Sequence, residues 1–110
     1  MRTGSLVVVT CAGPREKFFG VLLELTAVGG TIRGLPLDTF EDWLRQLQGG
    51  GEQLIGPVTL FFPAHRLERV EVDETSGAAE GLGDRVRRVS GLDPQDLLGG
   101  KAEEAPALPS

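Results

Sequence analysis

The sequence has one cysteine, one histidine, one tryptophan and no tyrosine among its 110 residues. The single thiol, Cys11, cannot form a disulfide within the chain, and one histidine with one cysteine does not give the ligand spacing of a zinc site. The scarcity of aromatic residues leaves few side chains on which nucleic-acid bases could stack. We therefore expect neither a bound metal nor a cofactor.

The chain also lacks any long hydrophobic run. No stretch approaches the roughly 18 apolar residues of a membrane-spanning helix, and the run LVVV before Cys11 is shorter than the roughly 7–15 residues of an export-signal core. The net charge is −5 and the estimated pI is about 4.8, so a nucleic-acid backbone or an anionic membrane would be repelled at long range. These features predict a cytoplasmic protein that does not bind membranes.

Short β-branched and apolar segments dominate the first two thirds of the chain. One of them, Phe18–Val28, alternates apolar side chains on one parity, and Gly20 allows it to bend so that one strand serves two sides of a small barrel. Pro36 restricts its strand to an edge or an end, and Pro63 separates two strands. The expected strands are Ser5–Cys11, Phe18–Val28, Thr31–Leu37, Val58–Phe62 and Leu67–Val72.

The clearest helix is predicted at Asp38–Gln48, with Asp38 as its N-cap, Glu41 completing a capping box, and glycines at 49–51 ending it. Its apolar stripe should cover an open end of the barrel. The stripe consists of Phe40, Trp43, Leu44 and Leu47. Residues 82–89 and a segment begun by Asp93 and Pro94 predict two further short helices. We expect a barrel domain at 1–75, a helical extension at 76–100 and a flexible tail at 101–110.

Gly13, the segment Phe19-Gly20-Val21-Leu22 and the strand pair VTLFF and LERVEV carry a family resemblance. With the insertion before the last two strands, they resemble the Sm-like superfamily, which includes the Lsm proteins and the bacterial Hfq RNA chaperone. The resemblance implies a five-stranded, strongly bent antiparallel small barrel of Sm-like or SH3-like type. It also implies rings, here of about five to seven subunits, joined by pairing of the fourth and fifth strands of neighbours.

The chain departs from this family at the RNA-contacting positions. Thr26 and the stretch Val28-Gly29-Gly30 stand where Sm and Lsm proteins have an aspartate and a Met-Asn pair, and Pro63-Ala64 replaces the family's Arg-Gly. Only His65 matches the bacterial Tyr-Lys-His motif. The resemblance therefore extends to the fold and the assembly rather than to the RNA-contacting residues.

One histidine and several arginines are the candidate ligand residues. His65 could change charge near neutral pH, and the arginines could contact phosphates. The alternative is a surface histidine and a solvated helix face whose arginines pair with Glu80 and Asp84. The candidate ligand or RNA-binding residues are His65, Arg66, Arg69, Arg85, Arg87 and Arg88.

The favoured hypothesis is a non-enzymatic Sm-like module that forms a homo-oligomer, with an RNA-binding post-transcriptional regulator as the alternative. A small enzyme, with Cys11 as nucleophile and His65 as base, is a third hypothesis. We expect no enzyme, because Cys11 fits a buried structural thiol and the carboxylates of the last strand fit a solvated face. We expect the subunit interface, or the core beside it, to contain Phe61, Phe62, Leu67 and Val70.

Overall fold

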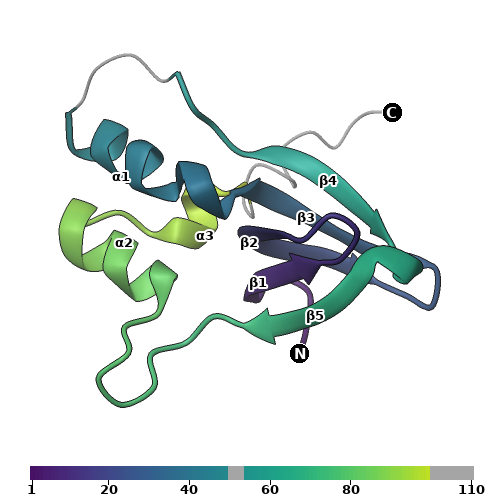
Figure 1. The fold of residues 1–110 in the computed structure, drawn as a ribbon. Helices are drawn as coiled ribbons and strands as arrows, with labels where there is room; N and C mark the ends of the chain where they lie inside the picture. The colour runs from purple at the N-terminus through teal and green to yellow at the C-terminus, as the bar shows by residue number, and fades with distance from the viewer. Residues whose placement is uncertain (50–53, 100–110) are drawn as a thin grey trace, which may run out of the picture.

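The computed structural model describes residues 1–49 and 54–99, and within them five strands and three α-helices follow one another as shown in Figure 1. The strands are β1 (Leu6–Cys11), β2 (Glu16–Leu25), β3 (Gly29–Pro36), β4 (Val58–Pro63) and β5 (Leu67–Val72). The helices are α1 (Phe40–Gly49), α2 (Leu82–Ser90) and α3 (Pro94–Leu97), with 3₁₀ turns η1 (Leu37–Thr39) and η2 (Ala64–Arg66).

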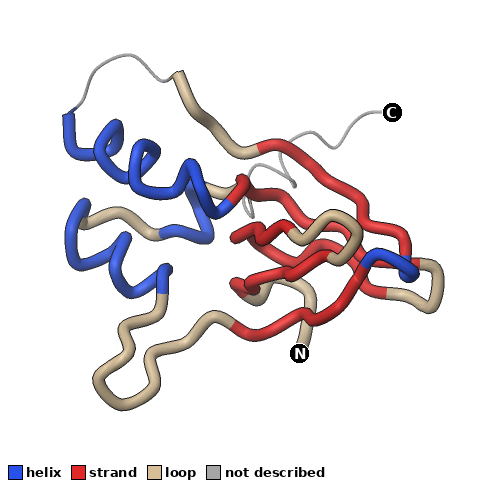
Figure 2. Tube along the Cα trace, viewed as in Figure 1, coloured by secondary structure: helices blue, strands red, loops and turns tan. Residues whose placement is uncertain are grey.

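The five strands form one antiparallel sheet in the order β4-β3-β2-β1-β5. The sheet curls, so that β4 and β5 converge at the three-residue turn η2 and separate towards the helices (Figures 1 and 2). In the described part of the chain β4 pairs only with β3 and β5 only with β1, so the sheet is open. The expectation of a mainly β, five-stranded antiparallel fold is confirmed, while closure into a barrel is not.

Both faces of the curled sheet are buried, because side chains of successive residues in a strand point to opposite faces. On the inner face, six buried residues pack together, and they are Val7, Val9, Cys11, Leu22, Ile32 and Phe62. The side chains on the opposite, outer face of β1 and β2 pack against the helices. Among them, Phe19 and Val21 lie in one cluster with Phe40, Trp43 and Val86. The helices thus cover the outer face of the sheet.

The helix α1 differs from its prediction in two respects. It begins at Phe40 after the 3₁₀ turn, so Asp38 lies inside that turn and is not an N-cap. Its apolar stripe, from Phe40 through Trp43 and Leu44, packs on the outer face of the sheet instead of closing one end of a barrel. The error has a physical cause, since the outer faces of β1 and β2 are themselves apolar and require a cover.

Gly20 is needed for close approach between strands. It lies opposite Gly34 in the β2–β3 ladder, and a Cβ at Gly20 would lie 2.5 Å from the carbonyl oxygen of Arg33. A bulge in β2 occurs farther along, between Leu22 and Glu24. The two facing glycines therefore bring the backbones of β2 and β3 together more closely than side chains would permit.

The C-terminal helices belong to the same packed unit as the sheet. Val86 of α2 and Leu98, which follows α3, are fully buried in the cluster that contains Phe19 and Trp43. Asp93 caps α3 by accepting a hydrogen bond from the Gln95 amide at 3.1 Å, as its sequence predicted. The tail expected at 101–110 lies outside the described residues.

Candidate functional site

The free edge of β4 is defined by the alternation of its backbone groups. The Ala64 amide donates to the Val28 carbonyl at 2.8 Å, which continues the register of the β3–β4 ladder. Because backbone groups alternate between the two sides of a strand, every second residue from Ala64 faces β3. Those residues are Val58, Leu60 and Phe62. Thr59 and Phe61 therefore present their amides and carbonyls to the free edge, and Pro63 presents a carbonyl but has no amide hydrogen.

The free edge of β5 follows from the same rule. The Asp73 amide donates to the Leu6 carbonyl at 2.8 Å, in register with the adjoining β1–β5 pairs. Glu71 and Arg69 then face β1. Val70 and Val72 present their backbone groups to the free edge on the other side.

The two free edges carry side chains on opposite faces of the sheet. Thr59 and Phe61 alternate with the inward-facing Phe62, so they lie on the outer face, whereas Val70 packs against the inner cluster. Directly opposed residues of an antiparallel pair must share a face. The pairings give β4 and β5 the same direction around the sheet, and a parallel pair needs a connection of about a dozen residues, whereas η2 has three. An antiparallel pair of β4 and β5 in one molecule would set an outer residue opposite an inner one. Closure of the sheet within the chain is therefore disfavoured in either arrangement.

The predicted interface residues divide into exposed and buried ones. The Phe61 side chain is 56% exposed, whereas Phe62 is 6% exposed and its ring centroid lies 4.9 Å from that of Phe18. Leu67 and Val70 are partly buried against the inner cluster. Sequence reasoning did not single out Val58 and Val72, which are 50% and 41% exposed at the ends of their strands. Phe61 is the predicted residue that an incoming strand would meet.

At the corner between β4 and β5, Arg66 binds the chain itself. Its Nε donates to the Ala12 carbonyl at 2.9 Å and its Nη2 donates to the Pro14 carbonyl at 2.7 Å, with the Glu16 carboxylate 3.4 Å away. Arg69 lies 3.7 Å from Glu71 on the same strand. Arg66 therefore ties η2 to the turn between β1 and β2.

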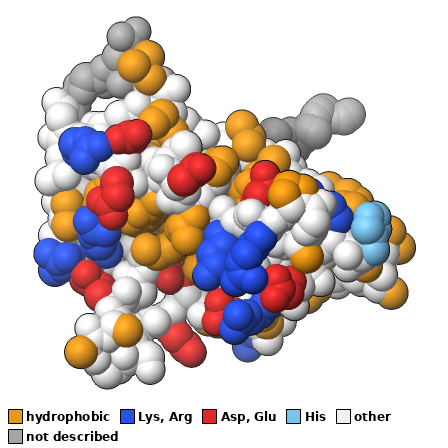
Figure 3. All heavy atoms as spheres, in the orientation of Figure 1, with side chains coloured by type: hydrophobic (Ala, Val, Ile, Leu, Met, Phe, Trp, Pro, Cys, Tyr) orange, Lys and Arg blue, Asp and Glu red, His pale blue; other side chains and the backbone are white. Residues whose placement is uncertain are grey.

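His65 is exposed on η2, and Figure 3 shows the histidine among hydrophobic side chains at the end of the molecule away from the helices. The arginines of α2 lie at the other end (Figure 1). The structure does not bring His65 and the arginines of α2 together into one surface.

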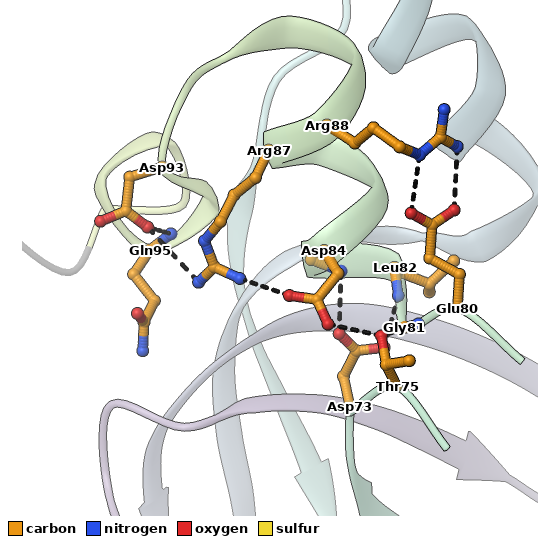
Figure 4. Close-up of polar contacts among 11 residues, drawn as sticks. Asp73, Thr75, Glu80, Gly81, Leu82, Asp84, Arg87, Arg88, Asp93 and Gln95 are labelled. Atoms are coloured by element: carbon orange, nitrogen blue, oxygen red, sulfur yellow. Dashed lines mark hydrogen bonds and ion pairs between the residues drawn. The ribbon is translucent and has the colours of Figure 1, made fainter. Parts of the chain in front are cut away.

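The arginines of α2 pair with acids, as Figure 4 shows for two of them. Arg88 makes two hydrogen bonds to Glu80, at 2.8 and 2.9 Å, which lower the pKa of the Glu80 carboxyl. Arg87 pairs with Asp84 at 2.8 Å. Arg85 donates from Nη2 to Glu41, also at 2.8 Å. This arrangement corresponds to the solvated, ion-paired helix face and occupies the groups that phosphates would need.

Arg85 also accounts for the position of Glu41. The sequence analysis placed Glu41 in a capping box at the start of the helix, but Glu41 reaches across from α1 to Arg85 of α2. Arg45 pairs with Asp42 along α1. The α1–α2 contact therefore combines this ion pair with the buried side chains beneath it.

Other chemistry finds little support in the described residues. Cys11 is fully buried, and burial raises the pKa of its thiol. In residues 1–49 and 54–99 no three histidine, cysteine or acidic side chains are grouped to hold a metal ion. No helix in the same ranges is long and apolar enough to cross a membrane.

An open cavity of about 550 Å³ lies where β2 begins and β3 ends. Its walls carry charges of both signs. They are formed by Arg15, Glu16, Lys17, Phe18, Pro36, Leu37 and Asp38. None of the predicted site residues lines this cavity.

Comparison of the chain with family models, curated proteins and solved structures gave no match. The candidate site is therefore defined by the geometry of the chain itself, and its best-formed feature is the pair of open sheet edges.

Proposed function

We propose that this chain is a non-enzymatic interaction module of the Sm-like type that assembles with copies of itself, the β4 edge of one molecule pairing with the β5 edge of the next. The observation that carries the proposal is the opposite facing of the two free edges. A neighbouring sheet that curves in the opposite direction presents its inner residues to the outer residues of β4. Antiparallel pairing with that neighbour then puts opposed residues on one face, which antiparallel pairing of β4 and β5 within one molecule would not do.

The composition of β4 supports the same assignment. Exposed edge strands are usually protected by charges, and β4 (VTLFFP) has none, with Val58 50% exposed and Phe61 56% exposed. Its one protective feature is Pro63, which ends the run of backbone donors. An uncharged edge of this kind fits strand addition by a partner.

The free donors and acceptors allow pairing only between residues that face the two edges, and we take the register that pairs both such residues of β4 with both of β5. Thr59 would oppose Val72 of the neighbouring copy and Phe61 would oppose Val70 of that copy, each pair exchanging two hydrogen bonds. The ladder would stop at Pro63, which lacks an amide hydrogen. Because the two edges of one molecule differ, each contact is head-to-tail, and repetition gives a closed ring if the rotation between copies closes.

The test is the solution mass of Phe61→Asp, compared with wild type and with Leu92→Asp. Pairing would bury the exposed part of the Phe61 ring, worth about 1–2 kcal/mol, and a carboxylate there loses this and adds a desolvation cost. We expect association to weaken at least about tenfold. Leu92 is 43% exposed between α2 and α3, away from both edges, so its variant should assemble as wild type does.

Phe61 is the informative position because Phe62→Asp would place a charge in the inner cluster and unfold the protein. Circular dichroism of Phe61→Asp should match that of wild type. A folded Phe61→Asp variant that retains the wild-type oligomer would contradict the proposal.

A further inference from the structure

The corner between the two free edges is short and fixed at both ends. Only η2 separates β4 from β5, and the Ala64 amide, at its start, bonds to the Val28 carbonyl. At its end the Arg66 carbonyl accepts a hydrogen bond from the Ala12 amide at 2.9 Å. The direction in which β5 leaves β4 is therefore set by what holds these three residues.

The side chain of Arg66 makes the additional contacts at this corner. It bonds two carbonyls of the β1–β2 turn, those of Ala12 and Pro14, and lies beside the Glu16 carboxylate. The side chain is 28% exposed, less than any other arginine that forms an ion pair in the described residues. A planar guanidinium with several fixed donors can hold two carbonyls and a carboxylate at once, which an ammonium group does poorly.

The contacts of Arg66 coincide with an irregularity in the ladder. The β1–β5 register shifts between Thr10 and Cys11, so that β5 bends where it leaves the corner. The bulge leaves the local ladder less regular, and Arg66, which precedes Leu67 in the chain, holds the adjoining η2 to the β1–β2 turn. The bend of β5 relative to β1, and so to the rest of the sheet, depends on both.

We infer that Arg66 is a positioning residue that sets the angle between the β4 and β5 edges and, through that angle, the number of copies in the assembly. The second half of the inference rests on the proposed function. In a head-to-tail assembly the rotation between neighbours is set by the relative orientation of the two edges, so a fixed corner gives one ring size and a loose corner gives several.

Two measurements test separately the role of Arg66 in the angle between the edges and its role in the number of copies. The first uses spin labels at Val58→Cys and Val72→Cys on a Cys11→Ala background, diluted with unlabelled protein so that each distance lies within one molecule. These sites are at the ends of β4 and β5 farthest from the corner, and both are exposed. We expect one narrow distribution of the distance between the labels when Arg66 is present. The distribution should broaden in Arg66→Ala and broaden less in Arg66→Lys.

The second measurement is native mass spectrometry of the unlabelled proteins. Wild type should give one dominant stoichiometry and Arg66→Ala a mixture. The control is Arg69→Ala, because Arg69 pairs with Glu71 along the same strand and ties no two elements together. It should leave both readouts unchanged.

The outcomes are distinguishable. A narrow distance in Arg66→Ala, with circular dichroism showing a folded protein, overturns the role of Arg66 at the corner. A broadened distance with an unchanged stoichiometry overturns its role in the number of copies. A monomeric wild type whose distance still broadens in Arg66→Ala refutes the proposed assembly and the control of copy number, and leaves the role at the corner standing.

Discussion

At the scale of single residues, burial rather than residue type decides the roles of the chemically reactive side chains. Cys11 is a potential nucleophile by type, yet it lies fully buried in the inner cluster beside Val9. Arg66 is a phosphate ligand by type, yet it binds two carbonyls of its own chain. His65, another of the predicted ligand residues, is exposed on η2.

The buried thiol makes a pH-dependent contribution to stability. Burial raises the pKa of Cys11 above its value in the unfolded chain, so the contribution is fully present below the unfolded pKa, near 8.5, and is lost as the pH rises through the folded pKa. We predict that the free energy of unfolding of wild type falls with rising pH in this alkaline range. Urea titrations should show a smaller fall in Cys11→Ala, whatever its stability at neutral pH, and equal slopes would refute the assignment.

At the scale of elements, the sequence pattern located three strands closely, and the other two strands and α1 less closely. The prediction placed β2 and β3 at Phe18–Val28 and Thr31–Leu37, so it misplaced the turn between them. β5 has the predicted bounds, and β1 and β4 each differ from prediction by one residue at one end, because Pro63 and the Ala-Gly-Pro turn are strong local signals. The start of α1 and the partner of Glu41 were missed, since both depend on where α1 packs and which helix lies beside it. Local sequence does not contain that information.

The sequence also could not show on which face of the sheet the side chains of the two free edges lie. Alternation shows which side chains of β4 share a face, but the ladder register shows which backbone groups remain unpaired. Phe61 and Phe62 are equivalent candidates by sequence, and burial separates them into an exposed edge residue and a core residue. The interface itself stays a prediction, and burial selects Phe61 as the residue with which to test it.

The cap of α2 comes from a residue distant in sequence and gives a prediction at this scale. The Asp73 carboxylate, just beyond β5, accepts hydrogen bonds from the amides of Leu82 and Gly83, both at 2.8 Å, as Figure 4 shows in part. Asp73→Ala should lower the free energy of unfolding by about 0.5–2 kcal/mol, the range for losing an N-cap. Urea denaturation measures this loss, and Glu71→Ala, whose carboxylate pairs with Arg69 on β5, is the control.

Loss of this cap should also destabilise α2 before the rest of the protein. Hydrogen exchange of the α2 amides is expected to accelerate in Asp73→Ala more than exchange of the β2 amides, because α2 would fray before the sheet opens. Equal acceleration throughout would show that Asp73 acts on global stability without a specific link between β5 and α2.

At the scale of the whole molecule, the fold is an open curled sheet with a helical layer on one face and two unlike free edges. Both faces of the central strands β1 and β2 are used in packing, by the inner cluster and by the helices, whereas Phe61 at the β4 edge stays exposed. The ion pairs on α2 place charged groups on the helical side of the molecule. This division of surfaces favours assembly through β4 and β5 over ligand binding at the helices.

The most direct test of the account is the solution mass of the wild-type protein, measured by light scattering over a range of concentrations after nuclease treatment. The account predicts a discrete oligomer with the mass of several copies, which dissociates on dilution and contains no nucleic acid. A monomer at every concentration would contradict it, and an oligomer that is lost on nuclease treatment would favour RNA as the partner.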